Sequence, residues 1–198
     1  AMHAGNDGKS GYQFEGKNYV GTFQHAEPVN TCIECHDQHS LDMRTSDSVD
    51  KDMCSTCHSE VNGPEDYRKI SMSKVDYDGD GAVEPVYDEI DGALATLYKA
   101  IQGYSAEKAA PFLFGENYPY VFNDTNGDGI AGEDETIFPN GYKSFTPRML
   151  RATFNYMFVS KDPGKYVHNA KYALQLIYDS IEDLAEFSGV STEGMVRP

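Results

Sequence analysis

The chain has 198 residues, of which 39% are hydrophobic, and a formal net charge of −16. Such an acidic surface repels nucleic acid and anionic lipid, so it excludes both as partners and favours basic proteins and divalent cations. There is no run of about 18 apolar residues, so we expect no membrane span in this chain.

Residues 1–24 are polar and rich in glycine, which favours a loose arm or an edge strand. They lack the apolar stretch of a signal peptide, so we expect an N-terminus processed after export. Residues 25–63 contain all the cysteines and most of the histidines. Neither helical nor alternating periodicity runs through them, which is typical of a segment organised by a cofactor.

Two copies of a Cys-x-x-Cys-His motif lie in this segment. In each copy the two thiols can add to the vinyl groups of a haem, and the histidine that follows can ligate its iron. The motifs predict two covalently attached c-type haems, held by Cys32, Cys35, His36, Cys54, Cys57 and His58.

Zinc is the main alternative, because the spacing of the two cysteine pairs also fits a four-cysteine zinc site. Haem is favoured, since a histidine follows both pairs and no basic surface indicates a zinc module for nucleic acid. Disulfides are a further alternative. Haem attachment to this motif takes place outside the cytoplasm, so we expect a periplasmic or extracellular protein whose cysteines are all consumed.

Four other histidines are candidates for the second axial position on each iron: His3, His25, His39 and His168. His39 lies too close to His36 along the chain to reach the opposite face of the same haem, so we expect it to bind the second haem. A surface histidine is the alternative for His39. For the first haem we expect His25, with His168 as the next candidate. His3 lies in the N-terminal arm and can more easily reach a neighbouring subunit.

An acidic loop follows, at Asp76, Asp78, Asp80 and Gly81, and it begins like an EF-hand calcium loop. Its twelfth residue is Tyr87, so the last carboxylate would come from one of three neighbours: Glu84, Asp88 or Glu89. A helix is expected next, ending at Gly103, because apolar residues recur at helical spacing: Ile90, Leu94, Leu97 and Ile101.

Residues 111–145 are expected to form a long aromatic and acidic connection that contains a second loop of the same kind. Its oxygen ligands match an EF-hand loop, with Glu135 in the twelfth place: Asp124, Asn126, Asp128 and Glu135. Ala131 replaces the larger apolar residue usual at the eighth place. A plain acidic turn is the alternative for both loops. We expect calcium in both, in a structural role.

Two further helices complete the chain. Thr146 and Pro147 favour the start of the first, whose expected apolar face consists of Leu150, Phe154, Met157 and Phe158. Asp162-Pro163-Gly164 ends it. Asn169 can cap the last helix, which ends near Gly189 and carries the stripe Leu174, Ile177, Ile181 and Leu184.

The run from His25 through both cysteine motifs resembles the doubled motif of multihaem c-type cytochromes. That resemblance implies that extra histidines ligate partner haems and that the protein moves electrons across the periplasm or outside the cell. Residues 162–172, around His168, resemble a region near the end of some large multihaem cytochromes. Two haems in 198 residues is a low density for that family, which indicates one module of a larger electron path.

We therefore predict a mainly α fold with long irregular loops, in which a dihaem segment (1–72) packs on a helical part (73–198). The predicted function is electron transfer through two haems, each ligated by two histidines, with no catalytic residue. Expected partners are redox proteins or other copies of the chain. Two alternatives remain: a haem enzyme, such as a peroxidase or oxyanion reductase, with one open iron, and a subunit of a cytochrome filament or surface complex.

Overall fold

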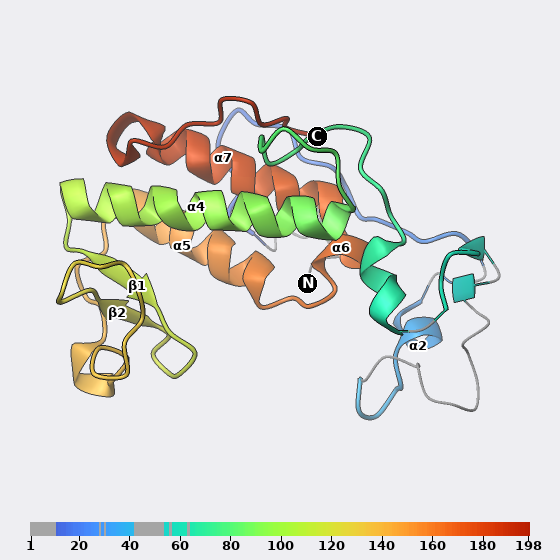
Figure 1. The fold of residues 1–198 in the computed structure, drawn as a ribbon, viewed down its shortest axis with the longest axis horizontal. Helices are drawn as coiled ribbons and strands as arrows, with labels where there is room; N and C mark the ends of the chain where they lie inside the picture. Colours follow the sequence, from blue (N-terminus) through green and yellow to red (C-terminus); the bar gives the residue numbers. More distant parts are fainter. Residues whose placement is uncertain (1–10, 28, 30, 42–53, 56, 63) are drawn as a thin grey trace.

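A computed structural model describes residues 11–27, 29, 31–41, 54–55, 57–62 and 64–198 (Figure 1). His3 lies outside these residues. The elements in chain order are α2 (Cys32–Cys35), the 3-10 helix η1 (Pro64–Lys69), α4 (Val86–Lys108), β1 (Phe112–Phe114), β2 (Val121–Asn123), η2 (Phe138–Asn140), α5 (Pro147–Ser160), α6 (Lys165–His168) and α7 (Ala170–Ser188). The fold is mainly α, as predicted.

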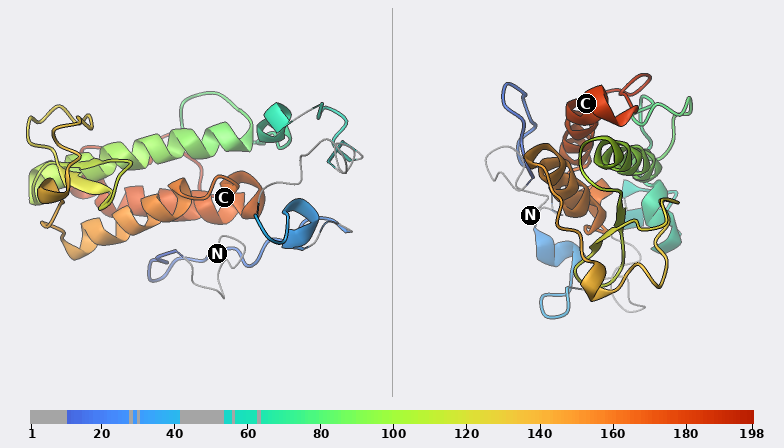
Figure 2. Two further views of the ribbon diagram at one scale, coloured as in Figure 1. Left: turned by 90° about the horizontal axis from the view of Figure 1, so that it is seen from below. Right: turned by 90° about the vertical axis from the view of Figure 1, so that its left-hand side faces the viewer.

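Helices α4, α5 and α7 lie side by side and enclose the hydrophobic core (Figures 1 and 2). The apolar stripes predicted for α4 and α7 are confirmed, since all their members are buried: Ile90, Leu94, Leu97, Ile101, Leu174, Ile177, Ile181 and Leu184. Burial of one apolar face of each helix against the other two therefore accounts for the association of the helices.

The predicted starts of α5 and α7 are confirmed. Thr146 Oγ1 accepts a hydrogen bond from Met149 N at 3.2 Å, and Pro147 is the first helical residue. Asn169 Oδ1 accepts from Tyr172 N at 3.3 Å. Each cap satisfies an N–H that has no partner within its helix. Helix α7 ends at Ser188 and is followed by Gly189, which has φ +71°, a conformation that glycine adopts without strain.

The predicted stop of α4 at Gly103 is wrong, because the helix continues to Lys108. A Cβ at residue 103 would lie only 2.1 Å from the carbonyl oxygen of Ser188. This glycine therefore allows the end of α7 to approach α4. A glycine inside a helix costs about 1 kcal/mol relative to alanine, and close packing of the two helices offsets that cost.

The apolar face predicted for α5 is only partly confirmed, since Phe158 packs against the core but two other members do not. Leu150 and Phe154 are 52% and 50% exposed, whereas Met149 and Asn155 are fully buried. Asn155 is satisfied inside the protein, since its Nδ2 donates to Tyr12 O and Ser180 Oγ, both at 3.0 Å. The buried face of α5 therefore combines small and apolar residues, Met149, Ala152 and Val159, with an asparagine that is satisfied by a distant part of the chain.

The 111–145 connection contains a short antiparallel hairpin that was not predicted, in which Leu113 pairs with Phe122. Both side chains are fully buried. The hairpin follows the C-terminal end of α4, at the opposite end of the helices from α2 (Figure 1). The helices therefore separate this connection from the cysteine motifs.

Residues 11–21 are irregular, with a turn in which Lys17 N donates to Phe14 O at 3.3 Å, and they pair with no strand in the described part of the chain. They lie along α5 and α7, where Gly11 N donates to the Tyr172 hydroxyl at 3.1 Å and Val20 N donates to Gln175 Oε1 at 2.9 Å. Tyr19 is buried in the core. This segment is thus part of the helical unit, although it precedes the cysteine motifs in the chain.

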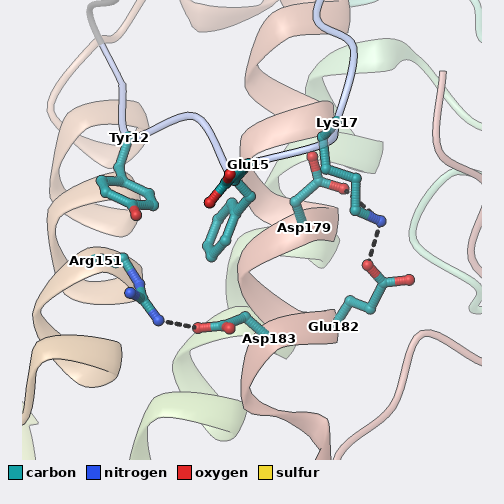
Figure 3. Close-up of a pocket in the computed structure, with 8 residues that line it drawn as sticks. Tyr12, Glu15, Lys17, Arg151, Asp179, Glu182 and Asp183 are labelled. Atoms are coloured by element: carbon teal, nitrogen blue, oxygen red, sulfur yellow. Dashed lines mark hydrogen bonds and ion pairs between the residues drawn. The ribbon is translucent and has the colours of Figure 1, made fainter.

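A shallow charged pocket lies between this segment and helices α5 and α7 (Figure 3). Lys17 contacts the carboxylates of Asp179 and Glu182. On the other side of the pocket, Arg151 Nη2 donates to Asp183 Oδ2 at 3.2 Å. Because these charges pair with one another, we interpret the pocket as an ion-pair network that attaches the N-terminal segment.

Candidate functional site

The two Cys-x-x-Cys-His segments share the same local turn. His36 N donates to Cys32 O at 2.8 Å, and His58 N donates to Cys54 O at 2.8 Å. The first turn, α2, is capped by Thr31, whose N–H donates to Glu34 Oε2 at 2.8 Å. All four cysteines are free thiols, as thioether formation requires.

The two segments lie close to each other. Burial raises the pKa of the Cys35 thiol, and the charge of Cys54 raises it further. Helix α2 buries no residue, and the described residues from 22 to 72 contribute only Val61 and Tyr67 to the buried apolar set. The described residues of this segment therefore form little core of their own, which fits the sequence expectation that a cofactor organises it.

His36 lies beside His168, and the two rings are tilted by 52° relative to each other. Their ring centres are 6.1 Å apart. His36 Nδ1 lies 2.8 Å from Leu41 O, and His168 Nδ1 lies 2.7 Å from Asp162 Oδ2. Since a carbonyl and a carboxylate can only accept, both Nδ1 atoms donate. This fixes the tautomers in which Nε2 carries the lone pair that a metal requires.

His58 is paired in the same way with His25, and their ring centres are 6.4 Å apart. The Nδ1 contacts are weaker here. His25 Nδ1 lies 3.4 Å from Ala26 O, and His58 Nδ1 lies 3.6 Å from Glu60 Oε1. The second pair is therefore held less firmly than the first.

The pairs of neighbouring histidines in the structure differ from the pairs of iron ligands that the sequence led us to expect. His25 lies beside His58 and not beside His36, and His168 occupies the position near His36. His39 lies outside both pairs: it is exposed, and its Nε2 is 3.4 Å from Gln38 Nε2.

The turn between α5 and α6 holds the His168 ring. From the sequence, this turn was predicted only as the end of a helix. Asp162 Oδ2 binds the ring, while Asp162 Oδ1 accepts from Gly164 N at 2.8 Å. A Cβ at residue 164 would lie 2.6 Å from the ring, so only glycine leaves space for it. The run Asp-Pro-Gly before a histidine was the signal available in the sequence.

The second acidic loop adopts the hydrogen-bonding pattern expected of a cation loop. Asp124 accepts from Gly127 N at 2.6 Å and from Gly129 N at 2.9 Å. Glu135 Oε1 accepts from Thr125 N at 2.6 Å. Ligand atoms of Asp124, Asp128 and Glu135 all lie within 4.8 Å of one another, whereas Asn126 donates to Asp128 Oδ2 at 3.0 Å.

The first acidic loop repeats this pattern with Glu89 as its last carboxylate. Glu89 Oε2 accepts from Tyr77 N at 2.6 Å, and Asp76 accepts from Gly79 N at 2.6 Å. Of the three carboxylates that the sequence left open, Glu89 thus accepts the backbone hydrogen bond that corresponds to the one on Glu135, but it is not part of the convergent group of its loop. Asp76, Asp78 and Asp80 converge within 4.8 Å. Burial raises the pKa of Asp78 to about 6, and neighbouring acidic groups add to the shift.

Comparison with known proteins gives two distant relatives from Geobacter sulfurreducens. The chain is 28% identical to the C-type polyheme cytochrome OmcC over 162 residues, which cover 69% of this chain and 20% of the relative. It is 26% identical to the C-type polyheme cytochrome OmcB over 207 aligned residues, which cover 88% of this chain and 25% of that relative. No protein-family model and no solved structure matches the chain.

The chain thus spans about a quarter or less of the length of these relatives. Their names support a relationship to multihaem c-type cytochromes and a role in electron transfer. Within the described residues, every helix is too short or too polar to cross a membrane.

Proposed function

We propose that this chain is an electron-transfer module that carries two c-type haems, each ligated by two histidines. The first haem would be attached at Cys32 and Cys35, and the second at Cys54 and Cys57. The observation that carries this proposal is that the histidine of each motif has a second histidine as its neighbour. When bound, each haem supplies an iron that alternates between the ferric and ferrous states.

The spacing within the two pairs fits ligation of one iron by both histidines. Imidazole nitrogens bind metals at about 2 Å, so two of them on opposite sides of an iron place their ring centres about 6 Å apart. The measured separations are 6.1 Å for His36 and His168 and 6.4 Å for His58 and His25. We therefore assign these two pairs in place of the pairing expected from sequence spacing.

The chain's own residues would set the properties of both sites. Two nitrogen ligands close an iron to substrates, which favours a relay over an enzyme. The adjacent motifs would bring the haems close enough to exchange electrons, and large apolar macrocycles would complete a segment that contributes little to the core. We propose that the helical part, through His168, attaches the first haem to the rest of the molecule.

Covalent haem attachment implies a periplasmic or extracellular location, as the relationship to polyhaem cytochromes also favours. Because the relatives are several times longer, we propose that the module passes electrons to further haem domains or to redox proteins. Its net charge of −16 favours a partner with a basic docking surface.

The proposal is tested by absorption and EPR spectra of the purified holoprotein, oxidised and reduced, with and without carbon monoxide. We expect two haems per chain by pyridine haemochrome assay, both low-spin and both unreactive toward carbon monoxide. A high-spin signal together with carbon monoxide binding would contradict bis-histidine ligation and revive the enzyme alternative. Zinc in place of haem would reject the proposal altogether.

Replacement Asp162→Asn is expected to raise the midpoint potential of one haem while both haems stay low-spin. A carboxylate that accepts from Nδ1 makes the histidine a stronger donor, which stabilises the ferric state. Asparagine can still accept that hydrogen bond but carries no charge. Spectroelectrochemical titration measures the shift.

Glu182→Gln, which removes a charge from the Lys17 ion pair, is the matched control. Its potentials should stay at the wild-type values. Equal shifts in both variants would show a general charge effect and no specific role for Asp162.

A further inference from the structure

One oxygen of Glu135 lies buried without a partner in the second acidic loop. The residue is 1% exposed, and Glu135 Oε2 forms no hydrogen bond. The other oxygen is fully engaged: Oε1 accepts from Thr125 N at 2.6 Å, from Thr125 Oγ1 at 2.8 Å and from Asn126 N at 3.3 Å. These bonds fix the direction of the carboxylate. A buried oxygen without a hydrogen-bond partner lowers the stability of the folded protein by about 1–3 kcal/mol, and by more when it is charged.

The surroundings of Glu135 indicate what this oxygen binds. Ligand oxygens of Asp124, Asp128 and Glu135 converge within 4.8 Å. Calcium–oxygen bonds are about 2.3–2.6 Å long, so two oxygens on one ion lie at most about 5 Å apart. Three convergent carboxylates repel one another, and a divalent cation removes both the repulsion and the unsatisfied oxygen.

We propose that the loop from Asp124 to Glu135 binds one calcium ion, with Glu135 as the buried ligand that orders the site. Asp124 and Asp128 supply further carboxylate oxygens, whereas Asn126 Oδ1 accepts from Asp128 N at 2.8 Å and helps to hold the loop. Calcium fits better than magnesium, because its larger and flexible shell accepts several carboxylates from one loop, whereas magnesium retains most of its waters.

The ion would stabilise the end of the molecule that lies away from the cysteine motifs. Gln102 of α4 donates from Nε2 to Gly129 O at 2.9 Å, which joins the loop to the helices. Asn140 donates from Nδ2 to Asn123 O and to Glu135 O, both at 2.8 Å. The loop therefore joins α4, β2 and η2, and Figure 1 shows this region at the opposite end of the helices from α2. Calcium would act on stability without altering the haems.

The test is calorimetric titration of metal-depleted holoprotein with calcium chloride, together with thermal unfolding with and without the ion. Glu135→Gln keeps the hydrogen bonds to Oε1 and removes the charge. We expect it to bind one calcium ion fewer than wild type, or to bind that ion at least about tenfold more weakly. Haem absorption should be identical in both proteins. The exposed neighbour Glu133 provides the control, Glu133→Gln, which should match wild type.

Asp128→Asn, at an exposed position, tests the same site if Glu135→Gln folds poorly. Weaker calcium binding in Asp128→Asn would support the site. Full calcium stoichiometry and affinity in both variants would overturn the proposal, as would equal affinity of the wild type for magnesium. Because the readout is calcium binding, failure here would leave the haem proposal unaffected.

Discussion

Replacing His168 with alanine is expected to open one of the two irons to carbon monoxide. His168 is the residue beside His36, with ring centres 6.1 Å apart. Its removal would leave that iron with a single protein ligand, since alanine cannot coordinate. We expect about half of the haem to become high-spin in the EPR spectrum and about half of the reduced haem to bind carbon monoxide, because one of two sites is changed.

The matched control is His39→Ala, the replacement of the histidine that sequence spacing favoured. His39 is exposed and lies outside both pairs, so its loss should leave two low-spin haems. His25→Ala should instead open the other iron, and His25→Ala combined with His168→Ala should open both. A His39→Ala protein that binds carbon monoxide would restore the sequence-based assignment and contradict ours.

His168→Met separates loss of ligation from loss of packing. The thioether can coordinate iron, so this variant should stay largely low-spin while the potential of one haem rises. If His168→Ala and His168→Met both retain wild-type spectra and potentials, His168 ligates no haem. The turn formed by Asp162 and Gly164 would then serve packing alone.

The features of the site that could be predicted from the sequence are those formed by residues close together in the chain. Each cysteine motif places its histidine one turn after its first cysteine, so a pattern of five residues predicts both this turn and the haem attachment that we propose. The acidic loop at Asp124–Glu135, in which we propose a calcium site, is local in the same sense. The starts of α5 and α7 were also predictable, because Thr146 and Asn169 cap helices through bonds to residues three positions ahead.

The pairing of histidines was not predictable, because it depends on contacts between distant segments. His168 reaches His36 only after α6 has packed against α4 and the Asp162 turn has fixed the ring. Sequence distance favoured His25 and His39, which are near the motifs in the chain. The N-terminal segment had a similar effect on α5, since Tyr12 satisfies Asn155 and makes a polar residue part of the buried face.

Glu89 illustrates a smaller failure of pattern matching. An EF-hand template requires a carboxylate at the twelfth place, but in the first loop the carboxylate that accepts the loop's backbone N–H groups lies two residues later. Glu89 lies in the first turn of α4 and accepts from backbone N–H groups of Tyr77 and Glu84. The start of a helix therefore supplied the residue that spacing alone left undecided.

Arg197→Ala is expected to cause the largest loss of stability in the helical part, about 3 kcal/mol, because it leaves a buried carboxylate with a weakened partner. The side chain of Asp179 is fully buried. Arg197 donates to both of its oxygens, from Nε at 2.8 Å and from Nη2 at 2.9 Å. Lys17 remains 3.7 Å away, so we expect a value at the low end of the range for breaking buried pairs.

The same arginine attaches the segment that leads to His25. Arg197 Nη2 also donates to Asn18 O at 2.7 Å, and its guanidinium lies over the Tyr19 ring at 5.2 Å. Loss of Arg197 should therefore destabilise the extended segment as well as α7. Urea unfolding of the holoprotein, followed by far-UV circular dichroism, measures the change in the free energy of unfolding.

Arg148→Ala provides the control, since Arg148 contacts Asp183 and Glu186 only at 3.6 Å and at a more exposed position. Exposed ion pairs contribute about 0–1 kcal/mol, so this variant should unfold close to wild type. Equal losses in the two variants would mean that Asp179 is solvated and that its pair with Arg197 is an ordinary surface contact. A large loss confined to Arg197→Ala would identify the C-terminal residues as the attachment point of the segment that carries His25.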